Sequence, residues 1–282
     1  MATLYGVIGD PIGHSLSPTM HNATFLANNI DAFYAKFHVT SEHLEDAIKG
    51  MKALGIKGFN VTIPHKETII PMLDEVDLYA MRIGAVNTVV NENGKLVGYN
   101  TDGPGFVCSL KELTRLSPEH NVLIIGAGGA AKGIIYALLE SGLAKIDVCN
   151  RSLNKAQELL ITVKKQMHHH RGHAMTIVQA ESNLDQYDIV IQTTSVGMYP
   201  NVDVSPIKMN KIKEQAACID IIYNPVETLF LKNAKSLGAF VQNGLGMFVN
   251  QGALSFAKWT GIDPEIEIMK QAIVNNSEES KC

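Results

Sequence analysis

The chain carries, at residues 122–131, the sequence Val122-Leu-Ile-Ile-Gly126-Ala-Gly128-Gly129-Ala130-Ala131. A run of apolar residues typical of a buried strand leads into the spacing Gly-x-Gly-x-x-Ala, and a helical pattern follows. Gly126 permits a tight turn, Gly128 lets a pyrophosphate approach the backbone, and Ala131 allows close packing of the helix. A plain glycine turn is the alternative, but the preceding strand and the following helix favour a dinucleotide site.

The next strand indicates which dinucleotide would bind. In a site that prefers NAD, an acidic residue about 20 residues further on accepts a hydrogen bond from the ribose 2′-hydroxyl. Here the predicted strand Ile146–Cys149 ends in Asn150-Arg151-Ser152, and Lys155 lies one helical turn later. A guanidinium at the tip suits a 2′-phosphate, so this segment favours NADP over the alternative of an ordinary loop arginine.

Short β-branched runs alternate with helical patterns on both sides of this segment. Such alternation predicts an α/β fold with a parallel sheet covered on both faces. Asn93-Gly94, between two strand patterns, predicts a type I′ hairpin. We also expect Ser17 to cap a helix and Met175–Val178 to form a strand.

Composition limits the classes of protein that fit. The 282 residues correspond to about two domains. The 24 basic and 28 acidic residues give a net charge of −4. This lack of excess positive charge argues against binding to nucleic acid or to an anionic membrane surface. No apolar run reaches the length of a membrane span, and no lysine or arginine precedes Lys36, so we expect no membrane segment and no export signal.

The cysteines and histidines offer no metal or disulfide framework. Cys108, Cys149, Cys218 and Cys282 lie far apart, which predicts no disulfides, no zinc site and a cytoplasmic location. Residues 164–173 hold two lysines, an arginine and four histidines. A metal or anion site is one interpretation, but adjacent histidines point in different directions, so we expect a solvated helix end and loop and no metal.

The N-terminal half carries polar clusters at predicted strand and helix ends. They are His14-Ser15-Leu16-Ser17-Pro18, Asn60-Val-Thr62-Ile-Pro64-His65-Lys66, Gly84-Ala-Val-Asn87-Thr88 and Gly98-Tyr-Asn-Thr-Asp102-Gly103. Each cluster alone could be turn or capping chemistry. Four of them ahead of a cofactor domain predict a site for a small polar molecule.

With these motifs, in this order and spacing, the chain resembles the shikimate dehydrogenase family over nearly its whole length. The resemblance also includes Asp220-Ile-Ile-Tyr223-Asn-Pro225 and Asn243-Gly244-Leu-Gly-Met247 leading to Gln251. It implies reversible, NADP-linked reduction of 3-dehydroshikimate to shikimate, within chorismate and aromatic amino-acid biosynthesis. It further implies that residues 1–103 plus 247–282 form the substrate domain and residues 104–246 a Rossmann-type NADP domain.

The resemblance assigns roles residue by residue. Lys66 and Asp102 match the catalytic pair, and a lysine suits the negative charge that develops on a ketone oxygen. The expected substrate-binding residues are Ser15, Ser17, Asn60, Thr62, Lys66, Asn87, Asp102, Tyr223 and Gln251. The expected cofactor-binding residues are Gly126, Ala127, Gly128, Gly129, Ala130, Asn150, Arg151, Ser152, Lys155, Thr194, Ile221, Gly244 and Met247. We assign no catalytic role to His65.

Alternatives remain at the level of function. One is a quinate/shikimate dehydrogenase that uses NAD, and another is a non-catalytic NADP-binding regulator on the same scaffold. Asn150-Arg151-Ser152 argues against the first, and the presence of Lys66 and Asp102 argues against the second. The expected partner is the small-molecule substrate, with neither nucleic acid nor membrane. The sequence leaves the oligomeric state open, with a homodimer as one candidate.

Overall fold

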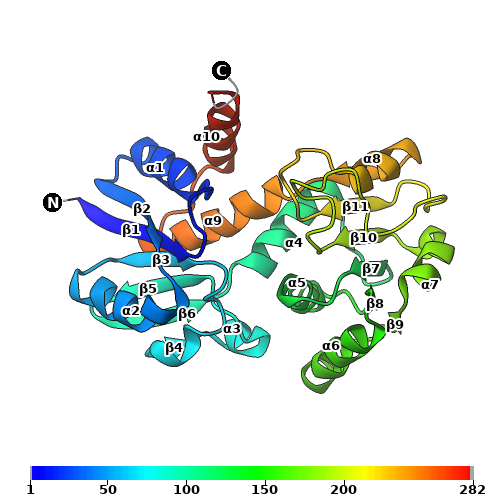
Figure 1. Ribbon diagram of the computed structural model, residues 1–282, viewed down its shortest axis with the longest axis horizontal. Coiled ribbons are helices and arrows are strands. Elements are labelled where there is room, and N and C mark those ends of the chain that lie inside the picture. The colour runs from blue at the N-terminus through cyan, green and yellow to red at the C-terminus, as the bar shows by residue number, and fades with distance from the viewer. Residues whose placement is uncertain (1, 280–282) are drawn as a thin grey trace. The chain divides into compact units, whose positions relative to one another are not determined.

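The computed structural model describes residues 2–279, which form two compact units (Figure 1). The first unit is discontinuous, because it contains residues 2–101 and 249–279. The second unit is the continuous segment Asp102–Phe248. Each unit has its own six-stranded sheet with helices packed on it.

The first unit is built on a mixed sheet with the strand order β2-β1-β3-β5-β6-β4. Strands β1, β2 and β3 are parallel, whereas β5 is antiparallel to both β3 and β6. The strands are β1 (Thr3–Gly9), β2 (Ala32–His38), β3 (Gly58–Val61), β4 (Glu75–Val76), β5 (Thr88–Glu92) and β6 (Lys95–Tyr99). The helices are α1 (Ser17–Ala27), α2 (Leu44–Ala53), α3 (Leu78–Ile83), most of α9 (Leu245–Thr260) and α10 (Ile266–Glu279).

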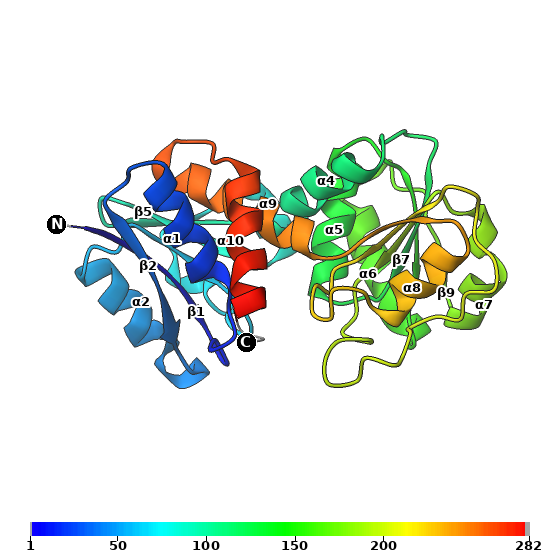
Figure 2. The same cartoon turned by 90° about the horizontal axis from the view of Figure 1, so that it is seen from above.

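The two faces of this sheet carry different side chains. On one face, Ile8, Phe59 and Val89 pack with Ile48 of α2 in an apolar core. Helices α1 and α9 cover the other face, and α10 lies beside α1 (Figure 2). There the ring centroid of Tyr5 lies 5.0 Å from Phe25 and 5.3 Å from Trp259. Because side chains alternate between faces, Tyr5, Tyr34, Asn60 and Thr88 share this α9 face.

Two local predictions in this unit have different outcomes. The hairpin is confirmed: β5 and β6 pair antiparallel, and Asn93 and Gly94 both have positive φ, as a type I′ turn requires. The prediction that Ser17 caps helix α1 is wrong. The helix begins at Ser17 itself, and the backbone N–H of Ser17 donates to the hydroxyl of Ser15 at 3.3 Å.

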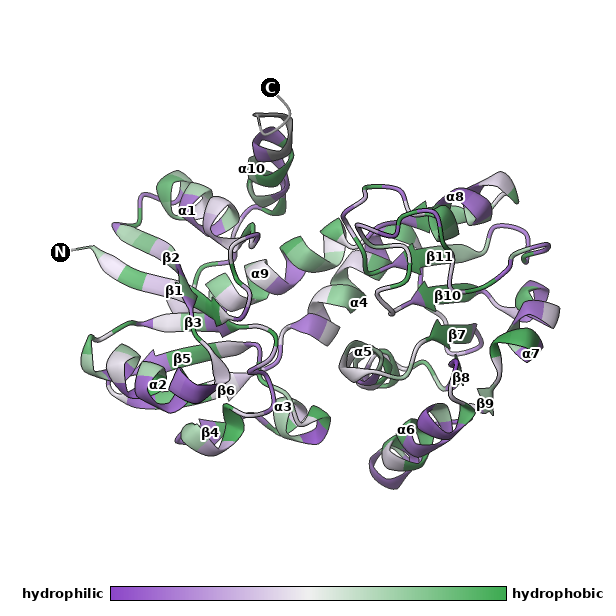
Figure 3. Ribbon diagram, viewed as in Figure 1, coloured by the Kyte–Doolittle hydropathy of each residue, from purple (hydrophilic) through white to green (hydrophobic). Residues whose placement is uncertain are grey.

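The second unit contains a fully parallel sheet with the order β12-β11-β10-β7-β8-β9. Its strands are β7 (Asn121–Ile125), β8 (Lys145–Cys149), β9 (Ala174–Met175), β10 (Ile189–Gln192), β11 (Ala217–Asp220) and β12 (Phe240–Gln242). Its helices are α4 (Asp102–Leu113), α5 (Gly129–Glu140), α6 (Leu153–Gln166), α7 (Ile177–Ser182) and α8 (Leu229–Ser236). Strands β7, β10 and β11 are almost uniformly hydrophobic (Figure 3), as parallel strands buried on both faces should be.

The order of these strands reverses between β7 and β10, which are neighbours in the sheet. In doubly wound folds, ligands bind beyond the carboxyl ends of the strands at this switch point. The glycine-rich turn that follows β7 lies there. The predicted α/β fold with a Rossmann-type second unit is confirmed.

The strand predicted at Met175–Val178 is wrong beyond Met175. Strand β9 ends at Met175, and α7 begins at Ile177. Thr176 and Gln179 form a capping box, in which the Thr176 hydroxyl accepts from the Gln179 N–H and the Gln179 side chain accepts from the Thr176 N–H. These two bonds satisfy orphan groups of the helix terminus, and they outweigh the β preference of Ile177 and Val178.

Candidate active site

The glycine-rich turn of the second unit has the conformation that the sequence predicts. Gly126 has a φ of +114°, and a Cβ there would lie 2.5 Å from the Thr193 hydroxyl, so only glycine fits. Gly128 and Gly129 are exposed, and a Cβ at either would have no atom of the described residues within 4 Å. The exposed glycines at the N-terminus of α5 therefore suit a phosphate-bearing cofactor, because helix N-termini favour phosphate groups.

Strand β8 brings the predicted cations to the same edge of the sheet. Ile125 and Cys149 are register partners, and the N–H of Gly126 donates to the Cys149 carbonyl at 2.8 Å. Arg151 and Lys155 are exposed just beyond this point, on the turn after β8 and in the first turn of α6. Two exposed cations beside the glycine turn suit the extra phosphate of NADP.

The remaining predicted cofactor residues follow three other strands. Thr194 follows β10, Ile221 follows β11, and Gly244 follows β12. A Cβ at Gly244 would lie 1.9 Å from the Ile221 carbonyl oxygen, so glycine permits the two turns to pack together. Met247 lies in the first turn of α9. The predicted cofactor residues thus follow the carboxyl ends of five strands, which are β7, β8, β10, β11 and β12.

Two buried residues that sequence analysis did not assign hold these turns. The side chain of Gln192 donates to the Thr194 and Val196 carbonyls at 3.0 Å and accepts from the Thr194 N–H at 2.5 Å. Asp220 accepts from the Ile222 N–H at 2.9 Å and from the Thr228 hydroxyl at 2.7 Å. Asp220 begins the motif Asp220-Ile-Ile-Tyr223-Asn-Pro225, whereas no local sequence pattern marks Gln192.

Asp220 is also electrostatically unusual. Burial raises the pKa of Asp220 to about 6, while its hydrogen bonds from Ile222 and Thr228 act in the opposite direction. Its bonds shape the segment 221–228, which carries Tyr223. The ring of Tyr223 lies 5.3 Å from that of Phe248, and burial raises the pKa of Tyr223.

In the first unit, the predicted substrate residues occur at two places. Ser15 and Ser17 lie at the start of α1, where the Ser15 hydroxyl accepts from the backbone of Ser17. Helix N-termini favour anions, so two hydroxyls beside one suit a carboxylate.

The second place is a buried network of amides and hydroxyls. The Nδ2 of Asn60 donates to the hydroxyls of Thr88 and Ser255, each at 3.1 Å. The Nδ2 of Asn87 donates to the side-chain oxygen of Gln251 at 3.4 Å. The structure therefore brings together three predicted substrate residues, Asn60, Asn87 and Gln251, which lie far apart in the sequence.

The remaining predicted residues lie on segments around this network. Thr62 follows β3, and its N–H donates to the Ile8 carbonyl at 3.0 Å. The backbone carbonyl of Lys66 accepts from the Val86 N–H at 2.8 Å, which ties the lysine segment to the residues just before β5, where Asn87 lies. His65 is buried, and its Nε2 donates to the Val39 carbonyl at 2.6 Å, as a packing role requires. Asp102 is the first residue of α4, in the second unit.

The histidine-rich segment is less solvated than predicted. His168 and His173 are exposed, but His170 is buried with its Nε2 at 2.9 Å from the Ile146 carbonyl, so that part of the prediction is wrong. The reason is the close packing of this loop on β8. Within residues 2–279, no group of three or more histidine, cysteine or acidic side chains is arranged to hold a metal ion.

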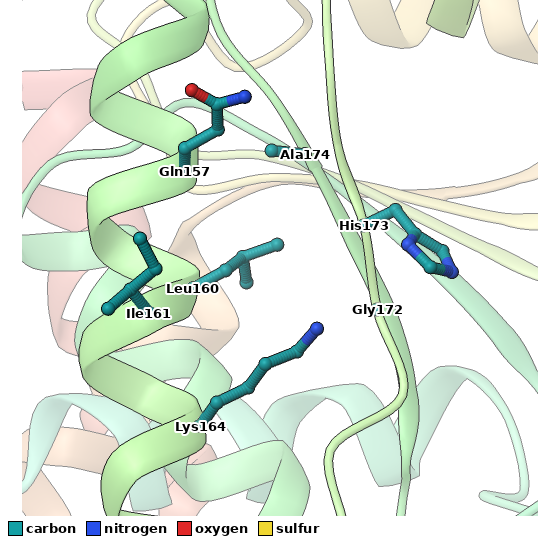
Figure 4. A pocket seen from close by; sticks show the side chains of 7 residues that line it. All are labelled: Gln157, Leu160, Ile161, Lys164, Gly172, His173 and Ala174. Carbon is teal, nitrogen blue, oxygen red and sulfur yellow. The ribbon is translucent and has the colours of Figure 1, made fainter.

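A pocket of about 280 Å³ lies beside this segment (Figure 4). Leu160 and Lys164 project from α6 toward the irregular segment at Gly172, and the ring of His173 lies on the far side of that segment. The pocket is lined by Gln157, Leu160, Ile161, Lys164, Gly172, His173 and Ala174. It is separate from the predicted cofactor turns, which follow the carboxyl ends of the strands.

Two further observations concern the chain as a whole. Cys108, Cys149 and Cys218 are free thiols, while Cys282 lies outside the described residues. Across the part of the chain that the structure describes, no helix combines the length and apolar character needed to cross a bilayer.

The chain combines a doubly wound unit that has a glycine turn at its switch point with an α/β unit that contains a buried polar network. This combination is typical of nicotinamide-dependent oxidoreductases. The description "Shikimate dehydrogenase substrate binding domain" matches residues 7–89, "Shikimate / quinate 5-dehydrogenase" matches residues 110–227, and "Shikimate 5'-dehydrogenase C-terminal domain" matches residues 244–274. The chain belongs to the shikimate dehydrogenase family.

Individual relatives agree with this assignment. A shikimate dehydrogenase (NADP(+)) from Geobacillus sp. is 51% identical over 275 residues, which cover 97% of this chain and 98% of the relative. A solved shikimate dehydrogenase in complex with NADP⁺ has 43% identity and a TM-score of 0.91, with 98% and 96% of the two chains covered. Quinate dehydrogenase from Corynebacterium glutamicum, in complex with NAD, has 29% identity and a TM-score of 0.88, with 97% and 99% covered.

Proposed function

We propose that this chain catalyses the reversible, NADP-linked reduction of 3-dehydroshikimate to shikimate, a step of chorismate and aromatic amino-acid biosynthesis. The observation that carries the proposal is the 51% identity, over 97% of the chain, to a relative named shikimate dehydrogenase (NADP(+)). The buried network of Asn60, Asn87 and Gln251 supports a polyhydroxylated substrate, because such amides can both donate to and accept from hydroxyls.

The cofactor residues that we propose act mainly through backbone and charge. The N-terminus of α5 at Gly128 and Gly129 would receive the pyrophosphate, and Arg151 with Lys155 would bind the 2′-phosphate. The turns at Thr194, Ile221, Gly244 and Met247 would line the nicotinamide. When bound, the nicotinamide supplies the hydride chemistry, and the protein supplies orientation and electrostatics.

For the substrate, we propose that Ser15 and Ser17 donate hydrogen bonds to the carboxylate. Asn60, Thr62, Asn87, Gln251 and Tyr223 would contact the ring and its hydroxyls. Lys66 would stabilise the negative charge that develops on the carbonyl oxygen, and Asp102 would orient Lys66 and a substrate hydroxyl. We propose Lys66 and Asp102 together as the catalytic pair.

A spectrophotometric panel tests this function against its two rivals. Purified protein is mixed with shikimate and NADP⁺, shikimate and NAD⁺, or quinate and either cofactor, and absorbance at the reduced-nicotinamide band is followed. We expect the highest kcat/KM with shikimate and NADP⁺. A preference for quinate with NAD⁺ would favour the quinate dehydrogenase, and no reduction in any mixture would favour the regulator.

Location and assembly complete the proposal. Three free thiols, at Cys108, Cys149 and Cys218, support a reducing compartment, and we propose the cytoplasm. We propose that the chain assembles as a homodimer. Light scattering of the purified protein at several concentrations tests this directly. A mass near 30.7 kDa at every concentration would overturn it.

A further inference from the structure

The side-chain amide of Asn60 is held at both of its ends by buried groups of the first unit. At one end, the hydroxyl of Tyr34 donates to Asn60 Oδ1 at 2.7 Å. At the other end, Asn60 Nδ2 donates to the hydroxyls of Thr88 and Ser255, and to the Asn87 carbonyl, each at 3.1 Å. The Asn87 carbonyl can only accept a hydrogen bond, so it fixes which end of the amide is Nδ2, and the Tyr34 hydroxyl then donates to Oδ1.

Tyr34 is fixed independently of Asn60. It is fully buried on β2, and its ring stacks on His21 with centroids 4.5 Å apart. Burial lowers the pKa of His21 to about 3, so the stacking partner is neutral at physiological pH. Burial raises the pKa of Tyr34 well above its usual value, while hydrogen bonds with the Ser17 side chain and Asn60 act in the opposite direction. The phenol therefore stays protonated and donates to Asn60.

The same phenol links two parts of the proposed substrate site. The phenol also interacts with the side chain of Ser17, and this interaction acts to lower the pKa of Tyr34. Ser17 is proposed at the substrate carboxylate, and Asn60 at the ring. Tyr34 thus connects the two ends of the proposed site.

Ser255, on α9, holds the other end of the Asn60 amide by accepting a hydrogen bond from Nδ2. It is fully buried, donates to the backbone carbonyl of Gln251 at 3.0 Å, and lies 2.8 Å from the Thr88 hydroxyl. Since its hydrogen is directed at Gln251, its oxygen is available to accept from Asn60. The position of Asn60 is therefore coupled to the helix turn that carries Gln251.

We infer that Tyr34 and Ser255 are positioning residues of the substrate site, which act by fixing the amide of Asn60 from its two ends. This inference rests on the proposed function, because it assigns Asn60 to the substrate. Neither residue is proposed to touch the substrate, because both are fully buried. Their effect is expected in substrate binding and not in cofactor binding.

The decisive variant is Tyr34→Phe, which removes one hydroxyl and keeps the ring. We expect the KM for shikimate to rise about tenfold, since a buried acceptor loses its donor, while the KM for NADP⁺ stays within twofold. The matched control is Tyr5→Phe. Tyr5 is the register partner of Tyr34, is also buried among aromatic rings on the same face, and its hydroxyl lies outside the Asn60 network.

A double-mutant cycle separates positioning from a merely structural role. In an Asn60→Ala background, Tyr34→Phe should change the KM for shikimate less than twofold, because the amide it orients is gone. Full additivity of the two changes, or an unchanged KM in Tyr34→Phe alone, would overturn the inference. If Tyr34→Phe does not fold, Ser255→Ala in the same cycle tests the other end of the amide. Wild-type protein without shikimate turnover would instead refute the proposed function, and the positioning role with it.

Discussion

The two proposed ligand regions are built from different parts of the polypeptide. The substrate region of the first unit uses side chains that bond to one another, such as Asn60, Asn87 and Ser255. The cofactor region of the second unit uses turns after parallel strands, with exposed glycines at Gly128 and Gly129. One region is a buried side-chain network, and the other is open backbone with cations around it.

The difference teaches how each region recognises its ligand. A backbone site binds phosphate groups that are common to many nucleotides, and one exposed residue such as Arg151 adjusts the choice. A bonded network offers each amide in a single orientation, so it discriminates among hydroxyl patterns, because an unpaired buried group is costly. Substitutions should therefore affect the two regions in different ways.

The largest effect is expected from Lys66→Ala. Loss of the group that stabilises the developing oxyanion should lower kcat by a factor of roughly 10²–10⁴, with a smaller change in the KM for shikimate. Initial rates at saturating NADP⁺ measure it. Lys57→Ala, which removes an exposed cation of the same unit, serves as the control. A kcat within threefold of wild type would remove Lys66 from the chemistry.

The next effect separates folding from binding within the glycine turn. Gly126→Ala should lower the free energy of unfolding by about 2–3 kcal/mol, because an alanine there has strained φ and meets the Thr193 hydroxyl. Gly128→Ala should leave that free energy within about 0.5 kcal/mol, since its surroundings are open, yet weaken NADP⁺ binding. Urea unfolding and fluorescence titration with NADPH measure the two quantities. Equal stability of the two variants would contradict this assignment.

A smaller effect should define the choice of nucleotide. Arg151→Ala should raise the KM for NADP⁺ by roughly 10- to 100-fold through loss of charge-assisted hydrogen bonds, and change the KM for NAD⁺ little. Lys164→Ala, an exposed cation near the C-terminal end of α6, is the matched control. If Arg151→Ala weakened both cofactors equally, the 2′-phosphate role would fail.

The smallest effect is the pH dependence of stability at Asp220. Its pKa is raised to about 6 in the folded protein, so between pH 4 and 6 the folded state binds more protons than the unfolded state. Stability from this group therefore falls as pH rises through that window and levels off above it. Relative to Asp220→Asn, wild type should lose about 1 kcal/mol of unfolding free energy between pH 5 and pH 7. Parallel pH profiles for the two proteins would show that Asp220 does not titrate there.

The comparison also explains what could be predicted from the sequence. The glycine turn and the cation after β8 were predictable, because each depends on local backbone conformation and on a short spacing. The network around Asn60 was predictable only in its motif residues. Tyr34 and Ser255 lie 26 and 195 residues from Asn60, and no local pattern connects residues so far apart.

The failed predictions have similar physical causes. The strand expected at Met175–Val178 rested on β-branched composition, which a two-residue capping box overrode. His170 was expected in solvent, but a contact with the Ile146 carbonyl, 24 residues away, buries it. In both places, specific hydrogen bonds outweighed the composition of the segment.

The packing of Trp259 has an optical consequence. It is the only tryptophan in the chain, its indole N–H donates to the Val89 carbonyl at 3.0 Å, and it lies against Tyr5, His21 and Tyr34. Selective excitation of tryptophan therefore reports on the first unit alone. Melting of the parallel-sheet unit should be nearly silent in this emission, so that fluorescence and circular dichroism together resolve the two halves without any label.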